Sequence, residues 1–199
     1  NNVEDVSKIV SICSESNIGI IPYGGGTGLV GGQILSNGFK PVILSLERMN
    51  KIRNFWPSEN IIIAEAGVIL RNIQDVANSL NKIFPLSLAS EGSANIGGNL
   101  ATNAGGINVV KYGNMRDIRI GIETVLPKGK VYNGLSRLRK DNTGYDLKNI
   151  FIGSEGTLGI ITAASLKLFP KPQSQASAFL VVIDSSTAIT LFEIFRDRL

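Results

Sequence analysis

The fold is decided by residues 22–32, which read Pro22-Tyr23-Gly24-Gly25-Gly26-Thr27-Gly28-Leu29-Val30-Gly31-Gly32. A short apolar run at 20–22 leads into these glycines and is typical of a β-strand. Because glycine has no Cβ, consecutive backbone N–H groups can converge on one ligand, and such groups bind anions. The stretch therefore predicts a strand followed by a loop that holds a phosphate or diphosphate.

Other glycine loops explain this stretch less well. The spacing Gly26-x-Gly28-x-x-Gly31 matches a Rossmann dinucleotide loop, with Glu47 as the candidate for a ribose contact. A Rossmann helix must follow at once, however, and residues 32–38 are too short and too rich in glycine to form it. A Walker loop is excluded because no Gly-Lys-Ser/Thr follows. A tight loop without a ligand remains an alternative, although so many glycines cost backbone entropy.

Two further glycine clusters lie at 92–106 and 153–159. The first combines glycine with Ser, Thr and Asn, which donate and accept hydrogen bonds and suit a neutral heteroaromatic ring or ribityl hydroxyls better than a metal ion. The same residues favour turns and caps, so a local role remains open for each of them. In the second cluster, Glu155 is a candidate for a helix cap or for a ribose contact.

Hydrophobic periodicity predicts the surrounding elements. Helices are expected over 3–13, capped by Asn1 or Asn2, and over 70–80. Strands are expected at 20–22, 42–46, 61–65, 118–126 and 160–168, with a hairpin turn at 127–130 leading to 131–132. Residues 85–106 are expected to be irregular, ordered and functional. A strand at 178–183 and a helix at 188–199 are expected to begin a new unit, and both chain ends suggest a piece of a longer protein.

Composition excludes several classes of protein. The 199 residues are 43% hydrophobic and 18% charged, which indicates one folded domain or two lobes. Histidine is absent, so Ser-His-Asp triads, Cys-His dyads and histidine metal sites are excluded. The net charge of +4 comes without a basic block, so no nucleic-acid partner is expected. No apolar run is long enough to predict a transmembrane segment.

The single cysteine, Cys13, excludes an intramolecular disulfide and any CxxC motif. Its place in a helical apolar pattern predicts a small buried side chain. A reduced thiol fits a cytoplasmic location, which we expect, with any membrane contact made only through an electron-acceptor partner.

The three clusters together resemble FAD-linked oxidoreductases of the vanillyl-alcohol oxidase and para-cresol methylhydroxylase (PCMH) type. The resemblance rests on residues 22–32, 96–106, 141–147 and 153–162, in that order, and it covers nearly the whole chain. Within that family the sequence is most similar to D-2-hydroxy-acid dehydrogenases, such as D-lactate dehydrogenase, the D subunit of glycolate oxidase and D-2-hydroxyglutarate dehydrogenase.

The resemblance implies an α+β, PCMH-type FAD-binding domain over 1–172. A small βα lobe would occupy about 1–82, and a larger, mostly antiparallel sheet lobe would occupy 83–172. Residues 173–199 would begin a C-terminal cap domain. FAD would lie between the two lobes and would be non-covalent with respect to histidine, because the chain has none.

The residues implied to contact FAD fall into three groups. Those at the diphosphate are Tyr23, Gly24, Gly25, Gly26, Thr27, Gly28 and Leu29. Those at the isoalloxazine and ribityl part are Pro85, Ser87, Ser93, Gly97, Gly98, Asn99, Thr102 and Asn103. Those on the adenine side are Gly156, Ile160 and Ile161. No metal site is implied.

The implied activity is hydride transfer from a small-molecule D-2-hydroxy acid, of the lactate or glycolate type, to FAD, with the electrons passing to a separate acceptor. No catalytic residue is assigned, because the resemblance places substrate binding in the cap domain, and this piece alone is expected to be inactive. Arg116 and Tyr145 are interpreted as structural or surface groups. Two alternatives remain: a flavoenzyme like UDP-N-acetylenolpyruvoylglucosamine reductase, and a non-catalytic nucleotide-binding module.

Overall fold

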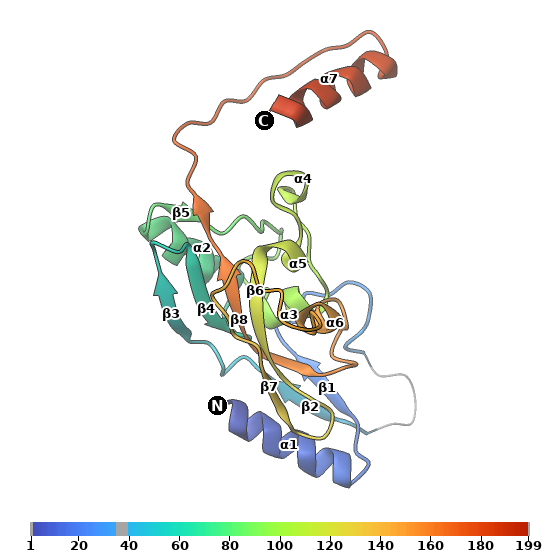
Figure 1. Ribbon diagram of the computed structural model, residues 1–199. Helices are drawn as coiled ribbons and strands as arrows, with labels where there is room; N and C mark the ends of the chain where they lie inside the picture. Colours follow the sequence, from blue (N-terminus) through green and yellow to red (C-terminus); the bar gives the residue numbers. More distant parts are fainter. Residues whose placement is uncertain (1, 35–39, 199) are drawn as a thin grey trace.

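The computed structural model describes residues 2–34 and 40–198 and combines helices with three sheets (Figure 1). The main sheet has five antiparallel strands in the order β3-β4-β8-β6-β7, a parallel pair joins β1 to β2, and a short antiparallel pair joins β5 to β9. The strands are β1 (Ile20–Tyr23), β2 (Val42–Ser45), β3 (Ile52–Trp56), β4 (Ile61–Glu65), β5 (Lys82–Ile83), β6 (Arg119–Val125), β7 (Val131–Asn133), β8 (Ile160–Lys167) and β9 (Phe169–Pro170). The helices are α1 (Val3–Glu15), α2 (Leu70–Ser79), α3 (Ile96–Ala101), α4 (Val109–Tyr112), α5 (Met115–Ile118), α6 (Lys148–Phe151) and α7 (Ser185–Arg198). This architecture confirms the expected α+β class.

The first helix and the parallel strand pair form a small layer. The side chain of Asn2 caps α1 by accepting the N–H of Asp5 at 2.8 Å. Val6 and Val10 on the buried face of α1 pack with Leu44 and Leu46, next to the main sheet. Burial of this apolar face, rather than helix propensity, holds α1 in place.

The main hydrophobic core lies on one face of the five-stranded sheet. Side chains of β4, β6 and β8 on that face meet α2 and α3, which contribute Leu70, Ile73, Ile96 and Leu100, each with no exposed surface. The amphipathic spacing that predicted α2 is therefore the spacing that buries it. The core fixes α3 against the sheet, where its first turn borders the cavity described below.

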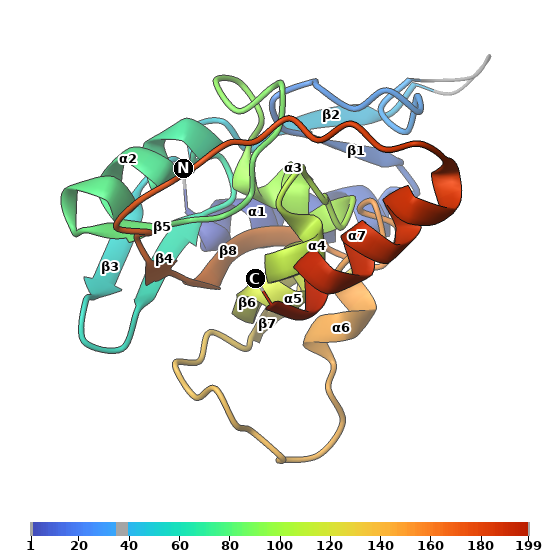
Figure 2. The same ribbon diagram turned by 90° about the horizontal axis from the view of Figure 1, so that it is seen from above.

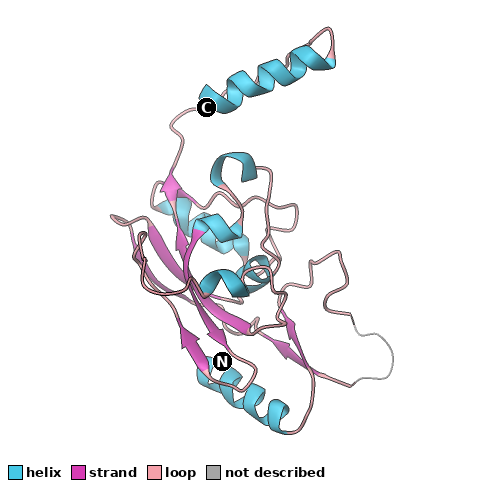
Figure 3. Ribbon diagram, turned by 45° about the vertical axis from the view of Figure 1, so that its right-hand side comes forward, coloured by secondary structure: helices cyan, strands magenta, loops and turns pink. Residues whose placement is uncertain are grey.

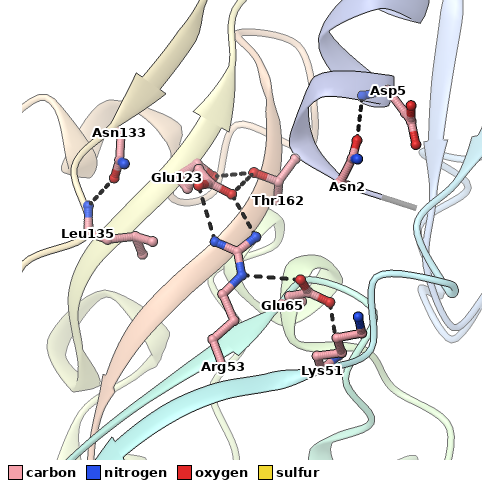
Figure 4. Close-up of polar contacts among 9 residues, drawn as sticks. All are labelled: Asn2, Asp5, Lys51, Arg53, Glu65, Glu123, Asn133, Leu135 and Thr162. Carbon is pink, nitrogen blue, oxygen red and sulfur yellow. Dashed lines mark hydrogen bonds and ion pairs between the residues drawn. The ribbon is translucent and has the colours of Figure 1, made fainter.

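The opposite face of the sheet carries a buried polar cluster (Figure 4). Glu65 and Glu123 both pair with Ala163 of β8, so their carboxylates project to the same side. Arg53 Nε lies 3.1 Å from one oxygen of Glu65, and its two terminal nitrogens donate to the two oxygens of Glu123 at 3.2 and 3.1 Å. Thr162 donates its hydroxyl to Glu123 at 2.8 Å, and the N–H of Lys51 donates to Glu65 at 2.9 Å.

Most of the elements expected from the sequence are confirmed. The two predicted helices correspond to α1 and α2, the predicted strands to β1, β2, β4, β6 and β8, and the predicted hairpin joins β6 to β7 through a turn with φ of +82° at Gly129. The second cap candidate, Asn1, and part of the stretch 32–38 that argued against a Rossmann helix lie outside the described residues. So does Leu199, at the end of the predicted last helix.

Three features differ from expectation. The strand predicted at 178–183 is wrong: the segment forms no ladder, because no described strand lies beside it to supply hydrogen-bond partners. It leads instead to α7, which stands apart from the body of the molecule in Figures 1 and 3 and lies in front of the body in the view of Figure 2. Strand β3 was not expected, and β3 and β4 belong to the same sheet as β6 and β8. The lobe boundary near residue 82 and the cap domain remain predictions.

None of the helices formed by residues 2–34 and 40–198 has the length and apolar character that crossing a bilayer requires.

Candidate cofactor site

A cavity of about 500 Å³ lies among the three glycine clusters. The loop after β1 and the turn before β8 contribute its walls, and the first turn of α3 contributes the part that we call the floor. The lining residues are Pro22, Tyr23, Gly24, Gly25, Gly26, Thr27, Gly28, Leu29, Val30, Gly32, Gln33, Leu46, Ala66, Leu88, Ser90, Asn95, Gly97, Gly98, Asn99, Ala101, Thr102, Ala104, Glu155, Gly156, Gly159, Ile160 and Ile161. Its volume falls within the usual range for small-molecule and cofactor sites.

The glycine loop presents unpaired backbone donors. From Gly24 to Leu29, no backbone N–H donates to any acceptor within residues 2–34 and 40–198. Gly24, Gly25 and Thr27 are half-buried, where backbone donors are normally paired, so their free N–H groups beside a cavity indicate a ligand acceptor. Gly26 has φ of +65°, a conformation that lets adjacent N–H groups point the same way.

Two glycines let separate chain segments meet closely around the cavity. A Cβ on Gly25 would lie 1.9 Å from the carbonyl oxygen of Ser93, so the glycine loop rests directly on the segment before α3. A Cβ on Gly97 would lie 2.6 Å from the Cβ of Ala66, which lets the start of α3 approach the end of β4. At Gly28, by contrast, a Cβ would meet nothing within 4 Å, because that position faces open space.

Two buried asparagine amides line the cavity without complete hydrogen bonding. Asn95 Oδ1 and Asn99 Nδ2 have no partner among the described residues. Hydroxyls of Thr124 and Ser165 in the sheet are also unpaired, so an orphaned atom alone does not define a site. The asparagines differ because they lie in the wall that faces the free N–H groups of the loop. The cavity wall therefore contains one unpaired amide acceptor and one unpaired amide donor, both covered by their surroundings.

The cavity carries almost no formal charge. Among the residues that the structure describes, the lining includes no Lys or Arg, and Glu155 is its only carboxylate. Glu155 has φ of +50°, and one of its oxygens lies 2.8 Å from where a Cβ on Gly32 would be, across the cavity mouth. An anion held here must therefore be held by backbone dipoles rather than by cationic side chains.

The cationic groups with shifted pKa values lie elsewhere. Burial lowers the pKa of Arg119 and of Lys167. Burial also acts to lower the pKa of Arg53, but the hydrogen bonds that Arg53 donates to Glu123 and Glu65, together with their charges, raise that pKa overall. None of these residues lines the cavity. The described residues also contain no group of three or more acidic, cysteine or histidine side chains that could hold a metal ion.

The structure brings most of the predicted cofactor residues around this one cavity. Tyr23 to Leu29, Gly97, Gly98, Asn99, Thr102, Gly156, Ile160 and Ile161 all line it. Their contact with FAD remains a prediction. Arg116 and Tyr145 match their interpretation as structural and surface groups: Arg116 donates to the carbonyls of Asn149 and Ile152, both at 2.6 Å, and Tyr145 is 93% exposed. Cys13 is buried, as its pattern predicted.

Four predicted residues do not line the cavity. Ser93 supports Gly25 through its carbonyl, as described above. Pro85 accepts the side-chain N–H of Asn108 at 2.9 Å, and the backbone of Ser87 packs against Gly106. The side chain of Asn103 accepts the backbone N–H of Arg116 at 2.9 Å. Ser93 thus supports the glycine loop, whereas Pro85, Ser87 and Asn103 bond or pack with Asn108, Gly106 and Arg116, which do not line the cavity.

The cavity also includes residues that were not predicted. Asn95 lies inside the glycine cluster at 92–106, so the polar composition of that cluster was a usable signal. Leu46 and Ala66 follow β2 and β4, and only the three-dimensional fold brings them to the cavity. Glu155 was a candidate for a ribose contact, and the structure places it at the mouth without a helix to cap.

Comparisons with known proteins found a matching family model, similar sequences and similar solved structures. A family model described as "FAD binding domain" matches residues 1–134. The chain is 44% identical to the mitochondrial D-2-hydroxyglutarate dehydrogenase of Danio rerio over 196 residues, which are 98% of this chain and 36% of that protein. It is 39% identical to a D-2-hydroxyglutarate–pyruvate transhydrogenase of Saccharomyces cerevisiae over 192 residues, which are 96% of this chain and 38% of that protein. The chain thus spans little more than a third of these curated relatives.

A solved structure of alkyldihydroxyacetonephosphate synthase superimposes with a TM-score of 0.75 at 31% identity, covering 86% of this chain and 31% of that one. The names of the relatives contradict the expected cytoplasmic location. The Danio rerio relative and others, from cattle and Arabidopsis, are named as mitochondrial proteins. The prediction was wrong because it rested on one free thiol, which excludes only an oxidising compartment and cannot separate one reducing compartment from another.

Proposed function

Because this chain belongs to the FAD binding domain family, we propose that it is the cofactor-binding part of a flavin-dependent dehydrogenase for D-2-hydroxy acids. The observation that carries the proposal is the run of unpaired N–H groups from Gly24 to Leu29, which faces a cavity lined by neutral polar groups. A diphosphate needs many donors, and a flavin ring with its ribityl chain needs mixed donors and acceptors. The residues present therefore fit FAD.

Each wall of the cavity has a role in this proposal. Backbone N–H groups of Gly24 to Gly28 bind the diphosphate. The floor formed by Gly97, Gly98, Asn99 and Thr102 supports the ring and ribityl part, where Gly98 offers open space because a Cβ there would meet nothing within 4 Å. Ile160 and Ile161, both nearly buried, exclude water on the adenine side.

When bound, FAD would supply the redox chemistry: it would take a hydride from the substrate carbon that bears the hydroxyl, the hydroxyl would lose its proton to a base outside this cavity, and the product would be a 2-oxo acid. The protein orients the cofactor and keeps water from the ring. Because the described lining holds no Lys or Arg, we assign recognition of the substrate carboxylate to residues outside this cavity, in the cap domain that we expect to begin near residue 173.

The substrate is a small 2-hydroxy acid, of the lactate or glycolate type or longer. Relatives named for D-2-hydroxyglutarate and for D-lactate support this class without choosing a member. The electrons leave to a separate acceptor. The FAD-binding domain covers residues 1–172 in this proposal. Non-covalent binding of FAD is consistent with the absence of histidine.

The first test is direct titration of the purified chain with FAD. We expect quenched flavin fluorescence and a bound flavin absorption band, whereas riboflavin, which lacks the diphosphate, should bind much more weakly. Equal binding of both ligands would contradict a site built around a diphosphate.

The second test uses the protein that contains this chain at full length. At least one of D-2-hydroxyglutarate, D-lactate and glycolate should reduce an artificial acceptor dye, and the L enantiomers of the first two should not. Oxidation of NADPH instead would favour the reductase alternative, and FAD binding without turnover of any hydroxy acid would favour the non-catalytic module.

A further inference from the structure

Asn95 occupies the N-cap position of α3, but its side chain does not cap the helix. An N-cap asparagine normally accepts a hydrogen bond from a first-turn N–H. Here the side-chain Nδ2 instead donates to the carbonyl oxygen of Gly67 at 2.8 Å. Because a carbonyl oxygen only accepts hydrogen bonds, the amide atom that faces Gly67 must be the nitrogen, and the other atom must be Oδ1. The Oδ1 therefore faces the glycine loop, 3.4 Å from where a Cβ on Gly24 would be.

This oxygen lacks a hydrogen-bond donor. Asn95 is only 5% exposed, and no group within residues 2–34 and 40–198 donates to its Oδ1. The atom itself is covered, so it lies behind the loop rather than open to the cavity. The donors beside it belong to the loop, whose N–H groups from Gly24 onward are free in the described part of the chain. A buried acceptor next to unpaired donors is the arrangement that a small loop movement would satisfy.

We propose that Asn95 is a positioning residue for the glycine loop: its Oδ1 accepts the backbone N–H of Gly24 or Gly25 when the loop closes on a diphosphate. This inference rests on the proposed function and concerns how the same site is shaped. An acceptor at this place would repel a phosphate oxygen, so the side chain acts on the loop and not on the ligand. The other N–H groups of Gly24 to Gly28 then remain free for the diphosphate.

The main test compares Asn95→Leu with the wild-type chain, using FAD, ADP and riboflavin as ligands. We expect affinity for FAD and for ADP to fall by the same factor, about tenfold, because one hydrogen bond in the closed loop is lost. Weak binding of riboflavin should not change, since it carries no diphosphate. The absorption spectrum of bound FAD should also stay the same, because the ring is not touched.

Asn108→Leu is the matched control. Asn108 is also an N-cap asparagine without a side-chain cap, and its Nδ2 also donates to a backbone carbonyl, that of Pro85 at 2.9 Å. It does not line the cavity. This variant should bind FAD and ADP like the wild type, so general loss of an amide-to-carbonyl bond is separated from the role proposed for Asn95.

A second variant, Asn95→Asp, keeps an oxygen behind Gly24 but loses the donor to Gly67 and adds a negative charge. If that position lies beside the bound diphosphate, affinity for FAD and ADP should be weakest at 20 mM salt and should partly recover at 500 mM, because salt screens the repulsion. Denaturant unfolding without ligand shows whether each variant is folded; should Asn95→Leu not fold, Asn95→Asp decides the question.

Each outcome has a defined meaning. Equal affinity of Asn95→Leu and wild type for FAD and ADP overturns the positioning role and leaves the proposed function standing. Loss of FAD affinity without loss of ADP affinity also overturns it, because Asn95 then acts on the flavin half. Salt-independent binding by Asn95→Asp contradicts the placement beside the diphosphate. Failure of the wild type to bind either ligand overturns the proposed function together with this inference.

Discussion

The cavity and the cluster around Arg53 are both polar regions inside an apolar fold, and they differ in how their polar groups are paired. In the cluster, Arg53 contacts Glu65 and Glu123, and Thr162 and a backbone N–H complete the carboxylates. In the cavity, the N–H groups from Gly24 to Leu29 have no acceptor in the described residues. The polar groups of the cluster are paired with one another, whereas the N–H groups at the cavity are left available to a ligand.

This difference separates stability from binding. A buried polar group without a partner costs free energy, so such groups persist where a ligand supplies the partner. Formal charge points the same way, because the cluster holds three charged side chains whereas the described part of the cavity lining has a single carboxylate and no Lys or Arg. We therefore expect substitutions in the cluster to change the free energy of unfolding and substitutions in the cavity to change affinity.

The largest effect is expected for Arg53→Met. It leaves the carboxylates of Glu65 and Glu123 buried without a cation, and breaking such a pair costs about 3 kcal/mol, the lower end of the usual range because the Arg53 side chain is 27% exposed. Urea unfolding measures this loss, and FAD affinity of the folded protein should stay within about twofold of wild type.

Arg137→Met provides the control for this prediction. Arg137 pairs with Glu59 on the surface, where both side chains are more than 40% exposed, so its loss should cost less than about 1 kcal/mol. A cost for Arg53→Met as small as this control would mean that the cluster is solvated. A large loss of FAD affinity in folded Arg53→Met would remove the separation between the two regions.

The next effect comes from two glycines of the same loop. In Gly25→Ala the new Cβ would lie 1.9 Å from the Ser93 carbonyl, so the loop must shift, and FAD affinity should fall by about a hundredfold with some loss of stability. In Gly28→Ala the Cβ meets nothing within 4 Å, so stability should stay within about 0.5 kcal/mol and affinity should fall by less than about tenfold. Fluorescence titration of both variants measures the difference.

If the two glycine variants lose the same affinity, close packing of the loop on the segment before α3 does not set its shape. If Gly25→Ala is destabilised yet binds FAD normally when folded, the loop is a structural element only.

The cavity could be predicted from the sequence because its chemistry resides in local glycine clusters. Gly24 to Gly28 follow an apolar strand, and Gly97 and Gly98 share a cluster with asparagines, so the loop and the floor were both indicated. Which member of a cluster faces the ligand could not be predicted. Ser93 and Asn95 are both polar and lie two positions apart, yet Ser93 supports the loop through its carbonyl and Asn95 lines the cavity.

The fold was predicted where periodicity reflects burial and missed where tertiary contacts override propensity. Strand β3 reads Ile52-Arg53-Asn54-Phe55-Trp56, without a clean alternation, and it forms because β4 supplies its hydrogen bonds. Helix α3 contains Gly97 and Gly98, and glycines weaken a helix. Close packing on Ala66 nevertheless requires a glycine at position 97. The apolar run 178–183 has strand composition but no partner strand among the described residues, so composition alone misled.

A third prediction concerns salt. Because no lysine or arginine lines the described cavity, FAD affinity should change by less than about threefold between 50 and 500 mM NaCl, since backbone dipoles at contact distance are screened little. Titration at several salt concentrations measures this dependence. A decrease of tenfold or more would show that a cationic side chain contacts the diphosphate, and the contrast between a charged cluster and an uncharged cavity would be lost.

The smallest effect concerns Lys167, a cation whose Nζ donates to the carbonyl of Asp117 at 2.6 Å and has no carboxylate in its described contacts. Burial, with Arg119 and Arg139 nearby, lowers the pKa of Lys167 below its ordinary value of 10.5. Between the lowered pKa and 10.5 the unfolded chain binds more protons than the folded chain, so raising the pH through this window stabilises the fold. The stability of wild type relative to Lys167→Met should therefore rise as the pH increases toward 10.5, and fall as the pH decreases through the folded pKa. Urea unfolding of both proteins at each pH measures the difference in their free energies of unfolding, and taking this difference removes the titration of all other groups. If the difference stays constant or declines as the pH rises, the carbonyl of Asp117 compensates the buried charge of Lys167 without a counter-ion.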